Sequence, residues 1–397
     1  MLLLSLVATA LVATASTTKL YVSSYAGTIT TLNLEHNNGT YSLTKLFSNT
    51  GCQANASWIR MDAPNHNLYC VDEGTVTGYG TLNSFKINEE TGNLTKVNRA
   101  KTAAAPVNSV MYTSPNGTQL LAVAHYTSTL TTWRLDTASA QFTLSQNISL
   151  NITHPGPKAD RQAASHPHQV LVDPQNKYFV IPDLGADLVR IYYIDPKTLQ
   201  ITARPSIPVV PGSGPRHGRF HNTGKNSTHY YLVTELGNTL TGYKTTYLPQ
   251  NGGLSLQPIM NSTTYGPANG TTFAGNAASE VYISQAGEEL IVSNRNASFF
   301  DLANPDPKNA THIKSDTLAT FPLSSDGKFS FGKLSPAGGS FPRHFAENQD
   351  GSLLAVGLQN TERVVIYRGS KGSGALGTDI LASFTGLGAV TSVVWGN

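Results

Sequence analysis

The strongest constraint on the fold is a unit of short apolar strands that recurs seven times along the chain. In each unit an apolar run is followed by a polar corner and, in most units, by a third strand of alternating character. Self-similarity at a fixed spacing of roughly 45–65 residues is typical of a repeat architecture. The apolar runs that set the register are Leu20–Val22, Leu68–Val71, Leu120–Val123, Tyr178–Ile181, Tyr230–Val233, Leu290–Val292 and Leu353–Val356.

Seven such units predict an all-β fold, a seven-bladed β-propeller, because one four-stranded sheet alone cannot bury both of its faces. The first unit begins directly at its second strand. We expect Ala389–Trp395 to supply the missing inner strand, so that the N- and C-terminal strands close the ring and remove an open sheet edge. Residues 16–397 are therefore predicted to form a single propeller domain.

Residues 1–15 have the character of a secretion signal. They contain an apolar run without charge and end in Ala13-Thr-Ala15, a small-x-small cleavage pattern. The run is too short to cross a hydrocarbon core of about 30 Å, so we expect a signal peptide and no membrane span. The predicted location is the extracellular space or the cell wall.

Eleven N-x-Ser/Thr triplets without proline agree with an exported chain. Several of them adjoin turn-like residues, where a glycan would be tolerated. The predicted glycosylation sites are Asn38, Asn55, Asn93, Asn116, Asn147, Asn151, Asn226, Asn261, Asn269, Asn296 and Asn309.

Cys52 and Cys70 are the two cysteines of the sequence. An oxidising compartment favours a disulfide between them, and the alternative is a pair of buried thiols. The formal net charge is only +3 and no run of Lys or Arg occurs, so we expect no nucleic-acid partner.

Aligning the seven units by their turns exposes two sets of polar residues. Innermost strands line the central channel of a propeller, so residues at the start of these strands should converge near the axis. That first set is Ser57, Ser109, His168, Arg216, Ser279 and Arg343. The second set follows the second strands and comprises Ser24, Glu73, His125, Asp183, Glu235, Asn294 and Leu358, with Arg295 directly after Asn294.

Propeller corners often use Asp, Asn, Glu and His only to hold neighbouring blades, and we assign Asp183 and Asp187 to that role. Strand alternation should turn His217 and His344 away from the axis. Clustered arginines, in contrast, repel one another unless an anion neutralises them, and a guanidinium binds a carboxylate through two parallel hydrogen bonds. Arg216, Arg295 and Arg343 therefore predict a site for a small polycarboxylate or phosphate.

Six segments of the chain resemble the seven-bladed propeller lactonase family, which includes fungal carboxy-cis,cis-muconate cyclase and bacterial 6-phosphogluconolactonase. The segments extend over most of the chain in the order found in the family. They are Ser165-His-Pro-His-Gln-Val-Leu-Val-Asp-Pro174, Val180-Ile-Pro-Asp-Leu-Gly-Ala-Asp187, Gly214-Pro-Arg-His217, Thr234-Glu-Leu-Gly237, Ser293-Asn-Arg295 and Pro342-Arg-His-Phe345.

The resemblance implies an active site built from His168, Arg216, Glu235 and Arg295, four residues that the two aligned sets also contain. It implies that the arginines clamp substrate carboxylates while His168 or Glu235 moves a proton, His168 being preferred as general acid in lactonisation. We expect Arg343, His125, Glu73 and Asn294 to contact the substrate, and we expect no cofactor and no metal.

Three functions are compatible with these residues. The preferred one is a secreted lactonising cyclase or lactonase for a small anionic carboxylate or lactone. A second is a secreted or cell-wall glycoprotein that uses the propeller to bind cell-wall or host-surface ligands without catalysis. A third is a 6-phosphogluconolactonase-like hydrolase, which the signal peptide disfavours.

Overall fold

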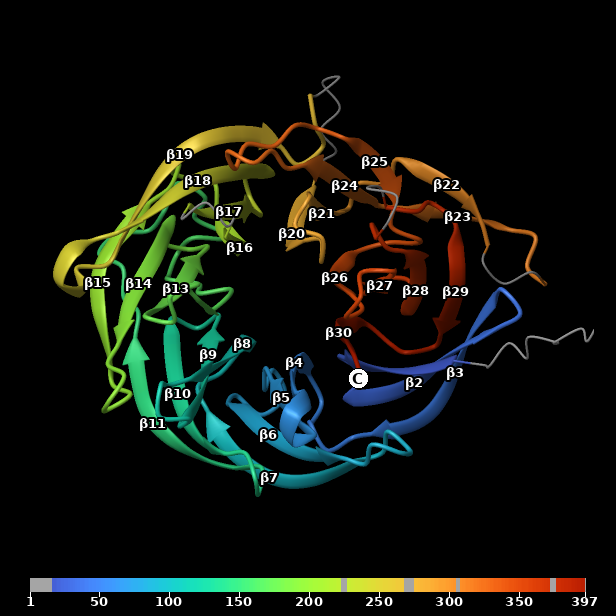
Figure 1. The fold of residues 1–397 in the computed structure, drawn as a ribbon, viewed down its shortest axis with the longest axis horizontal. Helices are drawn as coiled ribbons and strands as arrows, with labels where there is room; N and C mark the ends of the chain where they lie inside the picture. The colour runs from blue at the N-terminus through green and yellow to red at the C-terminus, as the bar shows by residue number, and fades with distance from the viewer. Residues whose placement is uncertain (1–15, 223–226, 268–274, 305–307, 372–375, 397) are drawn as a thin grey trace, which may run out of the picture.

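The structure, a computed structural model, describes residues 16–222, 227–267, 275–304, 308–371 and 376–396. Seven four-stranded antiparallel sheets surround one central axis, as Figure 1 shows along that axis. This confirms the predicted seven-bladed propeller. The predicted signal peptide, residues 1–15, lies outside the described residues.

Blades 1 to 7 follow one another in chain order, and the strands of each blade run from the inner to the outer edge in the order below. Blade 1 is β30 (Val390–Trp395), β1 (Ser16–Ser24), β2 (Thr28–Asn37) and β3 (Thr40–Asn49). Blade 2 is β4 (Ala56–Asp62), β5 (Asn67–Asp72), β6 (Gly80–Ile87) and β7 (Leu94–Thr102). Blade 3 is β8 (Pro106–Thr113), β9 (Gln119–His125), β10 (Thr129–Asp136) and β11 (Gln141–Ser149).

The remaining blades follow the same order. Blade 4 is β12 (Leu171–Val172), β13 (Tyr178–Asp183), β14 (Leu188–Ile194) and β15 (Ile201–Pro208). Blade 5 is β16 (Pro215–Asn222), β17 (Thr228–Thr234), β18 (Thr239–Tyr247) and β19 (Leu254–Thr263). Blade 6 is β20 (Ala277–Ile283), β21 (Glu289–Arg295), β24 (Thr317–Pro322) and β25 (Lys333–Pro336), with a separate hairpin of β22 (Phe300–Ala303) and β23 (His312–Ser315). Blade 7 is β26 (Pro342–Glu347), β27 (Leu353–Leu358), β28 (Arg363–Arg368) and β29 (Ile380–Thr385).

The two ends of the chain pair inside one sheet. β30 lies against β1 in antiparallel register, with Leu20 opposite Trp395 and Val22 opposite Val393. Blade 1 thus takes its inner strand from the C-terminal end and its other three strands from the N-terminal end. This is the ring closure that the sequence predicted.

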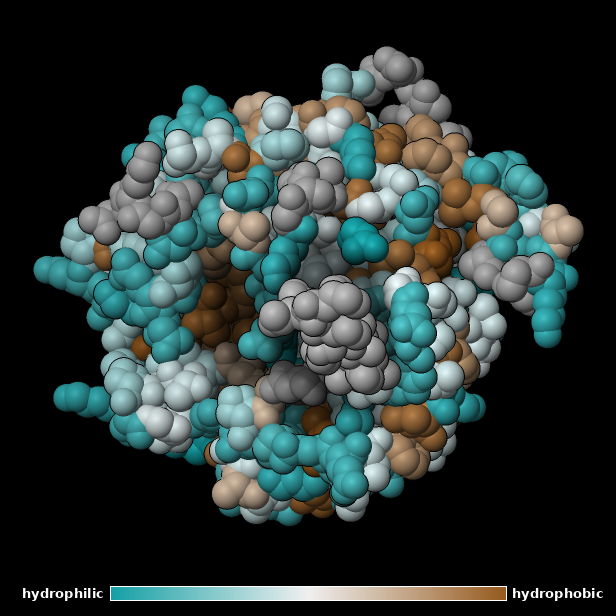
Figure 2. All heavy atoms as spheres, turned by 45° about the vertical axis from the view of Figure 1, so that its right-hand side comes forward, coloured by the Kyte–Doolittle hydropathy of each residue, from teal (hydrophilic) through white to brown (hydrophobic). Residues whose placement is uncertain are grey.

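The hydrophobic core is divided into seven clusters, one between each pair of neighbouring blades. Side chains alternate between the two faces of a strand, so one strand serves two clusters. In β1, Leu20 and Val22 pack against blade 7 while Tyr21 packs against blade 2. In the space-filling view hydrophilic and hydrophobic residues share the surface, and hydrophobic residues gather in the hollow left of centre (Figure 2).

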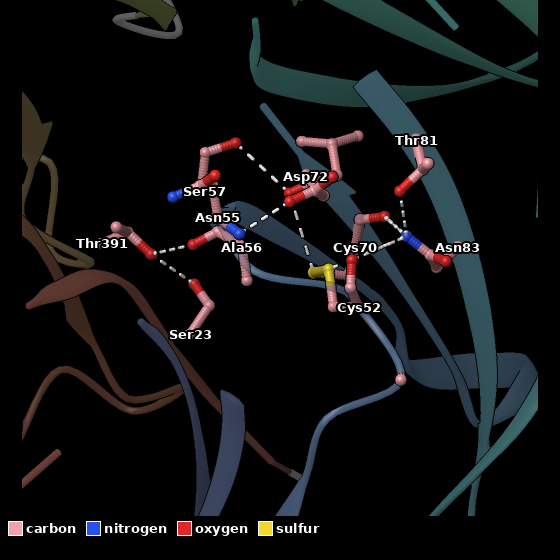
Figure 3. Close-up of a disulfide and its surroundings, with 12 residues drawn as sticks. Ser23, Cys52, Asn55, Ala56, Ser57, Cys70, Asp72, Thr81, Asn83 and Thr391 are labelled. Carbon is pink, nitrogen blue, oxygen red and sulfur yellow. Dashed lines mark hydrogen bonds between the residues drawn. A yellow bond between two sulfur atoms is a disulfide. The ribbon is translucent and has the colours of Figure 1, made fainter. Parts of the chain in front are cut away.

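Cys52 and Cys70 form a disulfide bond in blade 2, with Cα atoms 5.9 Å apart. Of the two alternatives raised for these cysteines, the structure has the bridge. Close to it, the Thr391 hydroxyl donates to the Ala56 carbonyl and also contacts the Ser23 hydroxyl, so that residues from β1, β4 and β30 meet (Figure 3). The disulfide therefore lies beside the seam where the ring closes.

Candidate active site

The inner strands share an irregularity at the edge of the central channel. In β4, β8, β16 and β26 the pairing register shifts after the first residue, which leaves one extra residue in a β-bulge. β20 has a similar shift between Ala278 and Val281. The extra residues include Ser57, Val107, Arg216 and Arg343. Because a bulge re-aims side chains and interrupts alternation, it can direct two successive residues toward the axis.

The bulges correct two sequence predictions. Val107, not Ser109, is the blade 3 residue at the bulge. His217 and His344 do not turn away from the central channel, since both make contacts with Glu280, itself on an inner strand. The predicted direction of these two side chains was wrong because bulges interrupt the alternation in β16 and β26. His168 is not at a bulge, because it precedes the two-residue strand β12. Its backbone N–H donates to the Pro182 carbonyl, which fixes its position.

The residue directly after each second strand occupies a second common position. Its backbone N–H donates to a carbonyl just before the inner strand of the same blade. These residues are Tyr25, Glu73, Tyr126, Leu184, Glu235 and Gln359. Arg295, the last residue of β21, reaches the same mouth of the channel. Glu73 and Glu235 were correctly placed by the sequence alignment, whereas Ser24, His125, Asp183 and Leu358 are one position too early.

His125 and Asn294 are therefore corrections to the predicted substrate contacts. Both side chains are fully buried, and they bind within their own blades and to the connection from the preceding blade. His125 contacts the Ala103 carbonyl through Nδ1 and the Thr131 hydroxyl through Nε2, while Asn294 donates to the Thr264 carbonyl. Burial lowers the pKa of His125 to about 4. Neither residue lines the pocket described next.

The bulges and corners together enclose a pocket of about 210 Å³ at one mouth of the channel. Its volume is below the roughly 300–1,000 Å³ typical of sites for drug-sized ligands, so it suits a small molecule. The lining residues are Tyr25, Glu73, Ala105, Val107, Tyr126, Arg161, His168, Arg216, Glu235, Arg295 and Arg343. A larger hollow of about 640 Å³ lies on the outer rim between β3, β22 and β29, and among the described residues that line it only Tyr41 and Asp379 are ionisable.

Glu235 is the centre of the charged network in this pocket. Its carboxylate oxygens contact Arg161 at 2.6 Å, Arg295 at 2.8 Å and Arg216 at 2.9 Å. Burial alone would raise the pKa of Glu235, but Arg295 and Arg216 outweigh it and hold the pKa well below its usual range. Glu235 is therefore a permanent carboxylate whose oxygens are occupied by guanidinium groups.

Arg216 is the most deeply buried of these cations, with 2% of its surface exposed. Its Nε donates to Glu235, and one terminal nitrogen donates to the Ser279 carbonyl at 2.6 Å. Burial and the neighbouring charge of Arg295 lower the pKa of Arg216 to about 9. Burial and the neighbouring Arg295 thus disfavour the charged form of Arg216, and a bound anion would favour it.

A second ion pair faces the first across the pocket. Arg343 lies 3.6 Å from the carboxylate of Glu73 and stacks over the ring of Tyr25, with 5.0 Å from guanidinium carbon to ring centroid. The Tyr25 hydroxyl donates a short hydrogen bond to the same carboxylate oxygen. This group supplies a charged and an aromatic wall from blades 1, 2 and 7.

Arg161 comes from an insertion that has no counterpart in the repeat. Residues 150–170 connect β11 to β12 and extend over the mouth of the channel. Lys158 holds this segment by donating to the Leu236 carbonyl at 2.7 Å, and Arg161 contacts Tyr126 as well as Glu235. Sequence reasoning missed Arg161, because repeat alignment carries no information about a non-repeating loop.

Two buried aspartates hold the corners that carry the arginines. Asp187 accepts hydrogen bonds from the backbone N–H groups of Gly212 and Gly214, and Gly214 is two residues before Arg216. Asp316 accepts from the N–H group of Asn296, directly after Arg295, and from that of Phe341, two residues before Arg343. Asp183 has the corner role expected of it, because it accepts from the His166 N–H and pairs with Arg190.

His168 is the one imidazole that lines the pocket. Its Nδ1 lies 3.2 Å from Nε2 of His217, and its ring meets that of Tyr126 edge-on at 5.8 Å. Burial, followed by the positive charge of Arg216, lowers the pKa of His168 well below its usual value. The side chain is consequently a neutral imidazole at physiological pH and can accept a proton.

The structure thus brings His168, Glu235, Arg216, Arg295, Arg343 and Glu73 to one pocket. Within the described ranges there is no group of three or more His, Cys, Asp or Glu residues that could hold a metal ion, and no helix long and apolar enough to cross a membrane. Of the predicted glycosylation sites, Asn226 and Asn269 lie outside the described residues. Asn55 is half-buried, and the other eight are exposed: Asn38, Asn93, Asn116, Asn147, Asn151, Asn261, Asn296 and Asn309.

Comparison with known proteins agrees with this architecture. The family model described as "Lactonase, 7-bladed beta-propeller" matches residues 19–393. A probable 6-phosphogluconolactonase of Arthroderma benhamiae is 27% identical over 87% of this chain and 81% of its own length. A 6-phosphogluconolactonase of Formosa agariphila is 25% identical over 84% of this chain and 86% of its own.

Solved structures show the same fold. The periplasmic gluconolactonase of Pseudomonas aeruginosa superposes with a TM-score of 0.78 at 22% identity, covering 96% of this chain and 99% of its own. A putative 6-phosphogluconolactonase of Bacteroides fragilis has a TM-score of 0.76 at 23% identity, covering 96% and 98%. Since the family model spans nearly the whole chain, the protein belongs to the family of seven-bladed β-propeller lactonases.

Proposed function

We propose that the protein hydrolyses a small lactone that carries about two negative charges, with His168 as general base. The observation that carries the proposal is the charge balance of the pocket. Four arginines face two glutamates around a neutral imidazole, which leaves an excess of two positive charges. A phosphate group, or two carboxylates, would neutralise that excess, and guanidinium groups bind both.

The contacts divide the acid–base roles between the two predicted groups. Both oxygens of Glu235 are engaged by arginines, so neither is free to take a proton from water, and its lowered pKa keeps it ionised, so it has no proton to give. His168 is neutral and has one nitrogen directed at His217, so the other ring nitrogen is directed at the pocket. His168 therefore takes the proton, and Glu235 holds the arginines in place.

The reaction follows from these assignments. His168 removes a proton from a water molecule as its oxygen attacks the lactone carbonyl carbon. Arg216 and Arg295, which carry more N–H bonds than their protein contacts use, stabilise the tetrahedral oxyanion. The ring C–O bond then breaks, and the protonated His168 returns the proton to the leaving oxygen. The product is a hydroxy acid, which releases its carboxyl proton to solvent and becomes a hydroxycarboxylate.

The test is a substrate panel with purified protein. Lactone opening would be followed by pH-stat with a phosphorylated sugar lactone, its unphosphorylated analogue and a carboxylated five-membered lactone. We expect kcat/KM for an anionic lactone to exceed that for the neutral analogue by at least about 100-fold, as for loss of a charged contact of about 3 kcal/mol. Equal rates on charged and neutral lactones would contradict the proposal.

The matched variants are two arginine substitutions. Arg216→Ala should abolish turnover, and Arg134→Ala, at an exposed position on β10, should leave it unchanged. The same assay run with 3-carboxymuconate tests the lactonising direction, which a base-form His168 disfavours because lactonisation across a double bond needs a proton donor. Absence of turnover on every substrate, with cell-wall binding unaffected by Arg216→Ala, would favour the adhesive alternative.

We also propose that the protein is exported and glycosylated. The support is the apolar segment ahead of Ser16 together with the eight exposed sequons. Expression in a eukaryotic secretory host should yield a chain that begins at Ser16 and loses mass on treatment with an N-glycosidase. Retention of residues 1–15 inside the cell would contradict export.

A further inference from the structure

We propose that His217 and Glu280 form a buried relay that fixes the proton of His168 on Nδ1 and so leaves its Nε2 as the base in the pocket. Both are positioning residues that have no contact with the pocket themselves. The catalytic consequence rests on the proposed lactone hydrolysis, but the proton positions can be measured without any substrate.

Three consecutive blades each supply one member of the relay. His168 precedes the inner strand of blade 4, His217 lies on β16 of blade 5, and Glu280 lies on β20 of blade 6. Nδ1 of His168 is 3.2 Å from Nε2 of His217, and Nδ1 of His217 is 2.9 Å from Oε2 of Glu280. The exposed fractions of the three side chains are 7%, 1% and 0%, so the chain leads from the pocket into the sealed channel.

The directions of the hydrogen bonds in the relay are set by Glu280, its fully buried member. A carboxylate only accepts hydrogen bonds, so Nδ1 of His217 must carry a proton to contact Glu280. In a neutral imidazole the other nitrogen is then an acceptor, which makes Nε2 of His217 accept from Nδ1–H of His168. The proton of neutral His168 is thereby placed on Nδ1, and Nε2 is left with its lone pair.

Glu280 is held as a carboxylate by several positive or donating groups. Besides His217, Arg219 approaches it to 3.6 Å and Nε2 of His344 to 3.9 Å. The backbone N–H of Val393 donates to Nδ1 of His344, so Nε2 of neutral His344 carries the proton and also faces Glu280 as a donor. Although burial alone would raise it, the pKa of Glu280 is lowered by His217 and Arg219.

The competing arrangement has a doubly protonated His217, which would donate to His168 and reverse its tautomer. Burial opposes that state, because it lowers the pKa of His217 to about 4 despite the attraction of Glu280. A positive charge on His168 is also disfavoured. Arg216 and Arg343 lower the pKa of His168, and Glu235 raises it without outweighing them and burial. Trp58 packs edge-on against His217 and His344 and restricts both rings.

The direct test is nitrogen NMR of the full chain with ¹⁵N-labelled histidine. In the wild type we expect His168 to show a protonated Nδ1 and an unprotonated Nε2 at neutral pH. In Glu280→Gln the new amide can donate to Nδ1 of His217, so the hydrogen bonds reverse and His168 should carry its proton on Nε2. A wild-type His168 with protonated Nε2, or an unchanged tautomer in a folded Glu280→Gln variant, would overturn the relay.

The kinetic test uses a double-mutant comparison. Glu280→Gln should lower kcat by about 100- to 10,000-fold, as expected when a catalytic histidine is held in the wrong tautomer. In a His168→Ala background the same substitution should have no further effect, because groups that act as one unit are not additive. An equal fold-loss in both backgrounds would overturn the relay and indicate a structural role.

Two controls separate folding from positioning. His125→Gln removes another fully buried histidine that lies outside the pocket, and it should lower thermal stability without lowering kcat. Glu280→Asp keeps a carboxylate and should retain more activity than Glu280→Gln. If the wild type opens no lactone but shows the expected tautomer, the proposed function fails and the relay stands.

Discussion

Glu235 and Glu280 are both buried carboxylates near the central axis, but they have different roles because their partners differ. Glu235 is surrounded by guanidinium groups and organises charge in the pocket. Glu280 is joined to an imidazole and organises a proton position. Because removing one partner from a buried charged contact leaves the other uncompensated, substitution at either site should cost about 3–5 kcal/mol in stability as well as activity.

The pH dependence of catalysis is the first prediction at this scale. A base with a depressed pKa stays unprotonated until the pH falls to that pKa, so kcat/KM should be constant from pH 8 down past pH 6.5. Below the pKa of His168, kcat/KM should then fall about tenfold for each unit of pH. A profile of kcat/KM against pH checks this, and a loss of activity centred at 6.5 or above would contradict a buried neutral His168.

Arg216→Lys is the second prediction. A lysine cannot contact Glu235 and the Ser279 carbonyl with the fixed geometry of a guanidinium, although it keeps the charge. We expect kcat/KM to fall by at least about 100-fold, a loss of about 3 kcal/mol in transition-state stabilisation. Exposed Arg134→Lys provides the matched control; near-normal activity in Arg216→Lys would show that charge alone suffices.

Residue identity at the site was largely predictable, but residue direction was not. Glu235, Arg295, Arg216 and His168 were found because the repeat placed them at aligned positions. Arg161 lies outside any repeat, and His125 was chosen in place of Tyr126 because the apolar runs locate a strand end only to within a residue. A one-residue error turns a side chain to the opposite face.

At the scale of single elements, strands were predictable and bulges were not. The apolar runs correctly located every second strand, since period and composition define them. A bulge depends on how one strand pairs with its neighbour, so the residues of the strand itself do not reveal it. His217, which strand alternation alone would turn away from the axis, consequently lies in the relay.

The Cys52–Cys70 bridge yields a prediction at the same scale. It closes a loop of sequence separation 18 in blade 2, next to the seam of the ring. Restricting such a loop in the unfolded chain stabilises the fold by about 3 kcal/mol. The double variant Cys52→Ala with Cys70→Ala should lose about that free energy of unfolding in urea titrations, while its kcat stays within a few-fold of wild type. An unchanged midpoint and slope would contradict this role.

For the whole molecule, buried neutral histidines predict an acid-sensitive fold. Burial lowers the pKa of His125 and His217 to about 4 and that of His344 to about 3. Below pH 6.5 the unfolded chain binds protons that the folded chain refuses, so the free energy of unfolding decreases as pH falls. Each such histidine contributes up to about 1.4 kcal/mol per pH unit between its unfolded and folded pKa values.

Urea unfolding followed by tryptophan fluorescence at pH 7.5, 6.0 and 5.0 measures this dependence. We expect a measurable loss between pH 7.5 and 6.0, because most unfolded imidazoles are protonated at pH 6.0, and a larger loss at pH 5.0. His344→Gln should make the free energy of unfolding depend less steeply on pH, since a glutamine side chain does not titrate. A free energy of unfolding that is the same at pH 7.5 and 5.0 would contradict the burial of these groups as neutral imidazoles.

The overall architecture was the most predictable feature. Seven repeats whose first unit lacks an inner strand form a closed ring if the C-terminal end supplies that strand. β30 fills that place, and the pairing of Leu20 with Trp395 ties the two ends of the chain. The site could not be derived from topology alone, because its geometry depends on corners such as those held by Asp187 and Asp316.

The bulged residues have a consequence for how proteins of this shape diversify. Arg216 and Arg343 are extra residues that the inter-strand ladder does not need, and their side chains face the channel instead of a blade interface. Replacing them can change what is bound while the hydrophobic clusters stay intact. Evolution, or a protein engineer, can thus exchange specificity one corner at a time without redesigning the scaffold.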